Sequence, residues 1–145
     1  MTKITKTISV QASPKKVIDY ISKVGNHPAF ISALKSIENI NGDEKEIGTS
    51  WDWTFMMGGI ELTGKSETIN YKEGEVYAFK TFNGADSTFT YSVEPEGDSS
   101  RLTINVEYSM PETVFAKMAD KAIVERLNEK EADSAADNLK AILES

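Results

Sequence analysis

The sequence predicts an α+β fold in which a seven-stranded, curved antiparallel sheet wraps around one long C-terminal helix, with two short helices between strands 1 and 2. Three observations carry this prediction. Short segments with alternating apolar residues fill most of the chain. Turn sequences rich in Gly, Asn and Pro separate these segments from residue 36 onward. After Pro111, the rest of the chain contains neither Gly nor Pro, as expected of a long helix.

The N-terminal part predicts one strand and two short helices. The segment "ITKTISVQ" (4–11) places Ile and Val on alternate positions, which is typical of a strand with one apolar face. Ser13 can cap a helix that starts at Pro14, because the missing N–H of proline costs nothing at the first helical position. Asn26 is the expected cap of a second short helix that reaches about Leu34.

From residue 36 onward the pattern is that of an antiparallel meander. Sequential strands joined by short turns are normally antiparallel neighbours, so the six strands expected here join the first in one sheet. Gly58 and Gly59 predict a tight turn between two of them. The expected strands lie near 36–42, 48–57, 60–71, 75–82, 86–95 and 100–109.

The C-terminal segment predicts a helix of roughly 30 residues, ~45 Å long, whose halves differ. The second half has one apolar stripe, in which alanines let a sheet approach closely: Ala132, Ala135, Leu139, Ile142 and Leu143. In the first half the apolar residues spread around the axis, which indicates more than one contact surface. They are Val114, Phe115, Met118, Ile123 and Leu127. Only this helix is expected to be large enough to cover the apolar face of the sheet, and a strongly curved sheet would leave a cavity beside it.

Composition excludes several classes of site. The 145 residues are most simply one domain, 1–145. The absence of Cys removes disulfides, thiol nucleophiles and cysteine-ligated metals, and the formal charge of −7 disfavours nucleic acid as a partner. We expect no cofactor and no metal site, since the chain lacks a P-loop, GxGxxG, HExxH or GxSxG pattern. Without a signal peptide or a run of ~20 apolar residues, we expect a cytoplasmic protein with no membrane insertion.

The segment "GTSWDWTFMMGG" (48–59) is the main candidate for a binding surface. It places Trp51, Trp53, Phe55 and Met57 on every second position, hence on one face of a strand. If that face is concave, these residues line a pocket together with aromatic residues of later strands, namely Tyr77, Phe79, Phe89, Tyr91 and Tyr108. Indole and phenol rings combine a large apolar area with one polar group, which suits an oxygenated apolar ligand. A filled core without a cavity is the alternative, because aromatic rows on strands are more often plain core.

Candidate pocket residues on the long helix are Met118, Leu127, Asn128 and Glu131. By helical phase Asn128 and Glu131 lie near the apolar stripe. An amide or a carboxylate facing an apolar pocket could hold a ligand hydroxyl or act as a base with a raised pKa. The plainer alternative is that these side chains pair with each other or point to solvent.

Other ionisable residues predict little chemistry. His27 is the only histidine, and its position at an expected helix start favours a surface or capping role over catalysis. Asp52 and Glu107 sit between members of the apolar rows and are expected to face outward. This placement argues against a buried carboxylate pair and hence against glycosidase-like chemistry.

Three segments of the chain resemble the START-like superfamily, and within it the SRPBCC or polyketide cyclase/dehydrase-like group. They are "IGTSWDWTFMMGGIELTGKSETI" (47–69), "FNGADSTFTYSVEPEGDSSRLTINVEYSMP" (82–111) and "VERLNEKEADSAADNLKAIL" (124–143). The resemblance covers nearly the whole chain and implies the helix-grip fold, in which a sheet grips the C-terminal helix around a deep apolar pocket. Members of the superfamily bind lipids, sterols, polyketides, quinones or plant hormones, and some are aromatase/cyclases. Where many relatives carry an Asp followed by a large residue between the first helices, this chain has "SKVGNHPAF", so no catalytic residue is assigned.

These observations predict binding or carriage of a small hydrophobic molecule, such as a lipid, an isoprenoid, a quinone or a polyketide-like aromatic. The ligand would lie between the sheet and the C-terminal helix, where apolar burial supplies the affinity. The alternative is a polyketide cyclase/dehydratase-type enzyme that uses the same cavity. An interaction protein that docks a partner through an edge strand or its acidic surface is a third possibility.

Overall fold

The computed structural model describes residues 2–109 and 121–145. Within them, seven strands form one antiparallel sheet in the order β1-β7-β6-β5-β4-β3-β2, which confirms the predicted sheet. The strands are β1 (Thr2–Val10), β2 (Leu34–Asn41), β3 (Ser50–Met57), β4 (Ile60–Lys72), β5 (Val76–Phe82), β6 (Asp86–Glu96) and β7 (Ser99–Ser109). The helices are α1 (Pro14–Ser22), the short 3-10 helix η1 (Val24–Asn26), α2 (His27–Phe30) and α4 (Lys121–Leu143).

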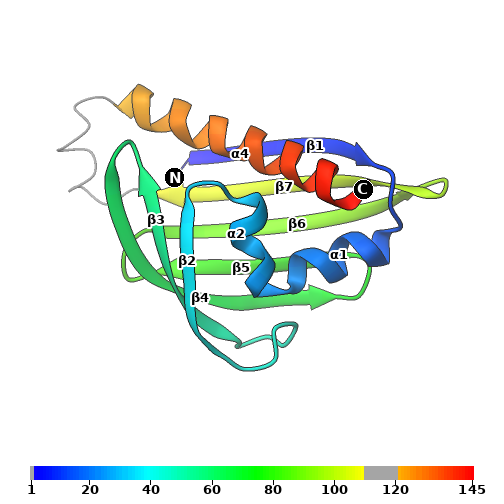
Figure 1. The fold of residues 1–145 in the computed structure, drawn as a ribbon, viewed down its shortest axis with the longest axis horizontal. Helices are drawn as coiled ribbons and strands as arrows, with labels where there is room; N and C mark the ends of the chain where they lie inside the picture. Colours follow the sequence, from blue (N-terminus) through cyan, green and yellow to red (C-terminus); the bar gives the residue numbers. More distant parts are fainter. Residues whose placement is uncertain (1, 110–120) are drawn as a thin grey trace.

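The sheet is strongly curved, and β2 and β3 run across the ends of the other strands (Figure 1). Register shifts mark where the strands bend: two lie between β2 and β3, and one lies between Thr68 and Asn70 where β4 pairs with β5. An extra residue on one strand of a pair increases the local twist. At the β3–β4 turn, Gly58 and Gly59 have φ angles of 55° and 82°, as a tight hairpin turn requires. The predicted turn is therefore confirmed.

The first helices follow the sequence only in part. The Ser13 side chain accepts a hydrogen bond from the backbone N–H of Lys16 at 3.2 Å, and Pro14 opens α1 as predicted. The expected cap at Asn26 is wrong. Because η1 runs directly into α2, Asn26 already has helical angles, and its amide instead donates to the carbonyl of Tyr20 at 2.9 Å. The second helix is also shorter than predicted, since it ends at Phe30 and β2 already begins at Leu34.

α4 lies against β1 along one side of the sheet (Figure 1). Four members of its predicted apolar stripe are buried, namely Ala132, Ala135, Leu139 and Leu143. Ala135, Leu139 and Leu143 belong to the main core, against which Ile142 packs, while Ala132 joins a smaller cluster with Ile4 and Tyr108. The residues Val114, Phe115 and Met118 lie outside the described residues. None of the described helices is long and apolar enough to cross a membrane.

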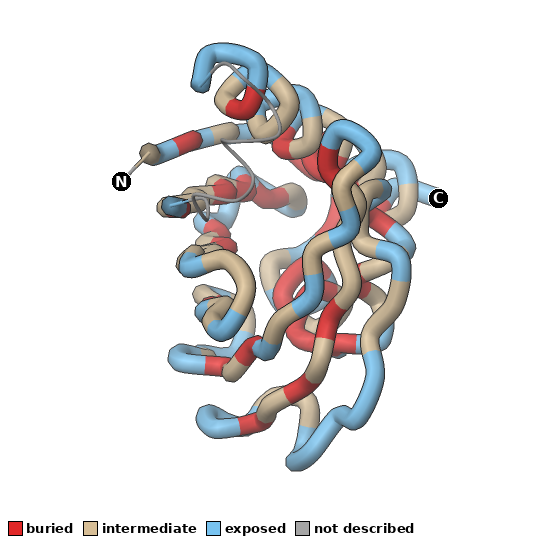
Figure 2. The backbone as a smooth tube through the Cα atoms, turned by 90° about the vertical axis from the view of Figure 1, so that its left-hand side faces the viewer, coloured by how far each residue is buried: buried red, intermediate tan, exposed pale blue. Residues whose placement is uncertain are grey.

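α4 does not cover the sheet alone, contrary to the prediction. α1 packs on β5, β6 and β7, and its Val17, Ile18 and Ile21 are fully buried. The amphipathic spacing of α1 gives it an apolar stripe that fits the middle of the concave face. Figure 2 shows buried positions alternating with intermediate and exposed ones along the strands and helices. The core therefore lies under α1 and the C-terminal half of α4. The opposite end of the concave face is not covered by α1.

Candidate ligand-binding pocket

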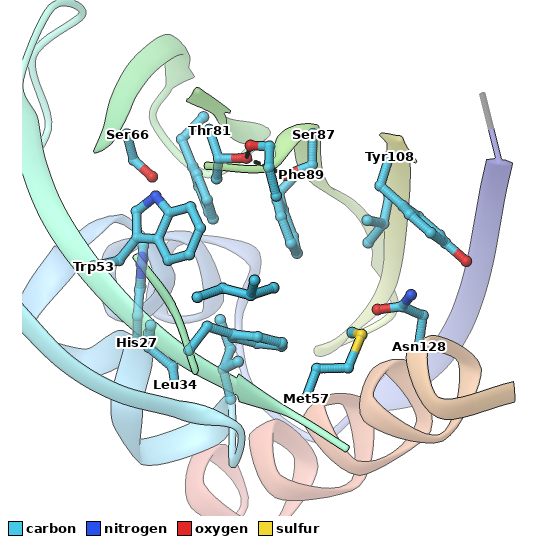
Figure 3. A pocket seen from close by; sticks show the side chains of 16 residues that line it. His27, Leu34, Trp53, Met57, Ser66, Thr81, Ser87, Phe89, Tyr108 and Asn128 are labelled. Atoms are coloured by element: carbon cyan, nitrogen blue, oxygen red, sulfur yellow. Dashed lines mark hydrogen bonds between the residues drawn. The ribbon is translucent and has the colours of Figure 1, made fainter. Parts of the chain in front are cut away.

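A cavity of about 100 Å³ lies at the end of the concave face that α1 does not cover, and it is half open to the outside (Figure 3). Its wall comes from strands β2 to β7, from α2 and the residue that follows it, and from the first half of α4. The apolar lining residues are Ile31, Leu34, Trp53, Phe55, Met57, Leu62, Phe79, Ala85, Phe89 and Val106. Common ligand pockets measure about 300–1,000 Å³, so this space fits a slim chain or a single ring layer.

The structure places seven of the predicted residues on the wall of this pocket. They are Trp53, Phe55, Met57, Phe79, Phe89, Tyr108 and Asn128. Three predicted aromatics, Trp51, Tyr77 and Tyr91, instead lie in the buried core, each at most 2% exposed. Leu127 and Glu131 are on α4 but do not line the cavity. Met118 lies outside the described residues.

The two tryptophans share one face of β3 but have different surroundings. The Trp51 ring packs edge-on against His27 and Phe79, with centroids 5.9 and 5.5 Å away. Trp53 is two residues further along, beyond these rings. It pairs with Gly64 on β4, and its indole N–H donates to the Lys65 carbonyl at 2.9 Å. Trp53 therefore faces the cavity, while Trp51 is part of the core.

His27 lies in the pocket wall, which shows that the predicted surface or capping role is wrong. Its side chain is 1% exposed, and its ring stacks on Phe79 with centroids 5.2 Å apart. Nε2 lies 2.9 Å from the Ile21 carbonyl, so Nε2 carries the proton and donates it. Burial lowers the pKa of His27 to about 4 because it disfavours the charged imidazolium. At neutral pH this ring is therefore an uncharged part of the aromatic wall.

Four hydroxyl-bearing side chains form one cross-strand row on the concave face. Ser66 on β4 pairs with Thr81 on β5, Thr81 pairs with Ser87 on β6, and Ser87 pairs with Tyr108 on β7. Directly paired residues in a sheet project from the same face. All four line the cavity, and we call them the hydroxyl row (Figure 3). Sequence reasoning missed three of them, because the pairing of four strands cannot be read from one-dimensional patterns.

No Asp, Glu, Lys or Arg side chain lies among the described residues that line the pocket. The candidate base Glu131 is engaged elsewhere: its carboxylate accepts hydrogen bonds from the Ser32 hydroxyl at 2.9 Å and the Ala33 N–H at 2.7 Å. Asp52 and Glu107 face outward as predicted, paired with Lys65 and Lys3. In the part of the chain that the structure describes, no group of three or more His, Asp or Glu residues could hold a metal ion.

The sequence of the chain matches, over residues 1–144, a family described as polyketide cyclase/dehydrase and lipid transport. The chain belongs to this family. A comparison with curated protein sequences found no match.

Solved structures with the same fold include three that cover nearly the whole chain. A START superfamily protein from Mycobacterium smegmatis has a TM-score of 0.76 at 17% identity, with 98% of this chain and 97% of that chain covered. The Zhui aromatase/cyclase from Streptomyces sp. R1128 has a TM-score of 0.79 at 10% identity, with 99% and 93% covered. The protein TTHA0849 from Thermus thermophilus has a TM-score of 0.81 at 15% identity, with 97% and 95% covered. The START-like, helix-grip fold is therefore confirmed, while identities this low show the fold alone.

Proposed function

We propose that this protein binds and carries a small hydrophobic molecule in the cavity between the sheet and α4. The observation that carries the proposal is a half-open hollow whose described wall is mostly apolar and carries no charged side chain. Trp53, Phe55, Met57 and Phe89 supply most of the contact area in this proposal. Removing apolar surface from water contributes roughly 25 cal/mol per Å², from which the cost of ordering the ligand is subtracted.

An enzyme of the polyketide cyclase/dehydratase type receives less support from the geometry. A general base works best with a pKa near the working pH, whereas burial holds the pKa of His27 at about 4. The carboxylate of Glu131 binds Ser32 and Ala33 rather than facing the cavity. The described wall thus offers orienting groups but no evident base, which favours a carrier.

The carrier function can be tested by extraction and titration. Protein purified under native conditions is extracted with organic solvent, and the extract is compared by mass spectrometry with that of an unrelated protein from the same host. In parallel, isoprenoids, quinones and flat aromatics are titrated while tryptophan emission is recorded. A co-purifying apolar compound, or a saturable change in emission, supports the proposal. An empty extract together with no response to any compound would show that the cavity is only a packing defect.

A further inference from the structure

The hydroxyl row has a hydroxyl group without a hydrogen-bond partner among the described residues at each of its two ends. These two groups limit the kind of ligand that the pocket can accept. The two central members of the row satisfy each other: Thr81 Oγ1 donates to the Ala85 carbonyl at 2.6 Å and lies 2.5 Å from Ser87 Oγ. The two end members differ. Ser66 Oγ and the Tyr108 hydroxyl are buried, and neither has a hydrogen-bond partner among the described residues.

Unpartnered buried hydroxyls are uncommon, because each one loses water without gaining a replacement. Ser66 is 1% exposed and Tyr108 is 6% exposed, and both line the same cavity. Burial raises the pKa of Tyr108, and the nearby side chains of Asn128 and Thr2 act in the opposite direction. Neither of these two side chains is hydrogen-bonded to the Tyr108 hydroxyl. Three strand spacings of about 4.8 Å separate the backbones of Ser66 and Tyr108, or ~14 Å.

Charge is absent from the described wall of the pocket. A ligand carboxylate placed there would lose its hydration and find no Lys or Arg on the described wall to replace it, which is strongly unfavourable. His27 cannot serve as the missing cation at neutral pH, since its pKa is about 4. Hydroxyl and carbonyl oxygens, in contrast, can pair with Ser66 and Tyr108 without a charge to neutralise.

We propose that the pocket selects a neutral, slim ligand with hydrogen-bonding oxygens at two separated positions, held by Ser66 at one end and Tyr108 at the other. This inference rests on the proposed carrier function and deepens it. Carboxylates of the same skeleton bind poorly, because their charged end must stay outside and leaves one of the buried hydroxyls unpaired.

The test uses isothermal titration calorimetry with three matched series of probes at about pH 7.5: linear α,ω-diols from butane-1,4-diol to decane-1,10-diol, the corresponding primary alcohols, and the corresponding monocarboxylates. Diol affinity should pass through a maximum at one chain length, and the carboxylate of that length should bind at least about tenfold more weakly. Ser66→Ala and Tyr108→Phe should each weaken the best diol about fivefold, the effect of one lost hydrogen bond.

Ser100 provides a matched control, since it is another fully buried serine on a strand but lies outside the pocket. Its hydroxyl donates to the Ala12 carbonyl at 2.6 Å. Ser100→Ala should lower the stability to urea without changing diol affinity. Ser66→Ala should lower diol affinity without changing the stability, because Ser66 has no hydrogen-bond partner among the described residues to lose. Folding and binding effects are thereby separated.

Two results would overturn the inference and leave the carrier function standing. One is equal affinity for the alcohol and the carboxylate of the same length. The other is unchanged diol affinity in both Ser66→Ala and Tyr108→Phe. If no probe binds at any length and the organic extract is empty, the carrier function itself is wrong, and the inference is wrong with it.

Discussion

The imidazole of His27 stacks on the ring of Phe79, with centroids 5.2 Å apart and an interplanar angle of 25°. Phe79 in turn stacks on Phe89 at 4.8 Å, so one histidine is built into an aromatic wall. Protonating this ring would place a positive charge where, among the described residues, only the Ile21 carbonyl is hydrogen-bonded to it. The protein therefore carries a pH-sensitive group inside its core.

We expect the stability of the protein to fall as the pH drops from about 6.5 to about 4. The pKa of His27 is lowered from 6.5 to about 4 in the folded state. Within this window the unfolded chain binds a proton at His27 and the folded chain does not, so the unfolded state is favoured. The full loss is about 3 kcal/mol, at 1.36 kcal/mol per pKa unit.

Urea unfolding between about pH 7.5 and about pH 4.5 measures this loss. The matched variant is His27→Gln, whose amide can still donate to the Ile21 carbonyl but does not titrate. The difference between the two proteins should shrink as the pH falls, because only the wild type loses the contribution of a neutral histidine. Parallel pH profiles for the two proteins would contradict the assignment of a buried, neutral His27.

The two indoles should respond differently to a bound ligand. Trp53 lines the cavity, whereas Trp51 is packed against His27 and Phe79 in the core. With a ligand from the titration or the extract, we expect Trp51→Phe to keep the change in emission and Trp53→Phe to lose most of it. Steady-state fluorescence of the two single-tryptophan proteins checks this. Equal responses from both would place the ligand elsewhere.

Sequence patterns predict which residues of β3 share a face, but not which of them line the cavity. The period-two pleat determined that Trp51, Trp53 and Met57 share one face of β3, and this holds in the structure. It could not determine which of them meets the hollow, because that depends on how far α1 and α2 extend over the sheet. The same limit applies to His27: the sequence predicts its position at a helix start, but nothing local shows that α2 turns its first residue inward.

Cross-strand pairing is the second feature that the sequence does not reveal. Ser66 and Tyr108 are 42 positions apart in the sequence, as their numbers give, and they share one row only because three hairpins align their strands. Register depends on turn lengths and on bulges such as the shift between Thr68 and Asn70. The residue pattern of a single strand reveals neither the turn lengths nor the bulges, so it cannot predict the register.

Gly64 is expected to be required for the position of Trp53. A Cβ at residue 64 would overlap the Trp53 ring and crowd the Phe82 carbonyl. Gly64→Ala should therefore displace the indole and destabilise the protein by about 1–3 kcal/mol, as overpacking generally does. Urea unfolding and the wavelength of Trp emission measure the two effects. Gly25→Ala is the control, because a Cβ there meets only Glu44 Oε1, at 3.8 Å, and a similar loss in that variant would contradict this explanation.

Glu131 is expected to hold α4 to the segment between α2 and β2 rather than to perform chemistry. Its carboxylate accepts from the Ala33 N–H at 2.7 Å and the Ser32 hydroxyl at 2.9 Å. Glu131→Ala leaves the half-buried donor of Ala33 unpaired, which should lower the free energy of unfolding by about 1–3 kcal/mol. Glu131→Gln should lose less, because the amide oxygen can still accept one of these hydrogen bonds.

The matched control for both variants is Glu129→Ala, an exposed position on the same helix, where substitutions usually change stability by less than about 0.5 kcal/mol. Urea unfolding ranks the three variants, and calorimetry with the best-binding diol measures affinity in each. If Glu131 only joins two elements, affinity in Glu131→Gln stays within about twofold of the wild type, since the carboxylate does not line the cavity. A fully stable Glu131→Gln protein that still binds a ligand but no longer transforms one that the wild type converts would instead place this carboxylate in the chemistry, and would restore the cyclase-type enzyme as the better account of the pocket.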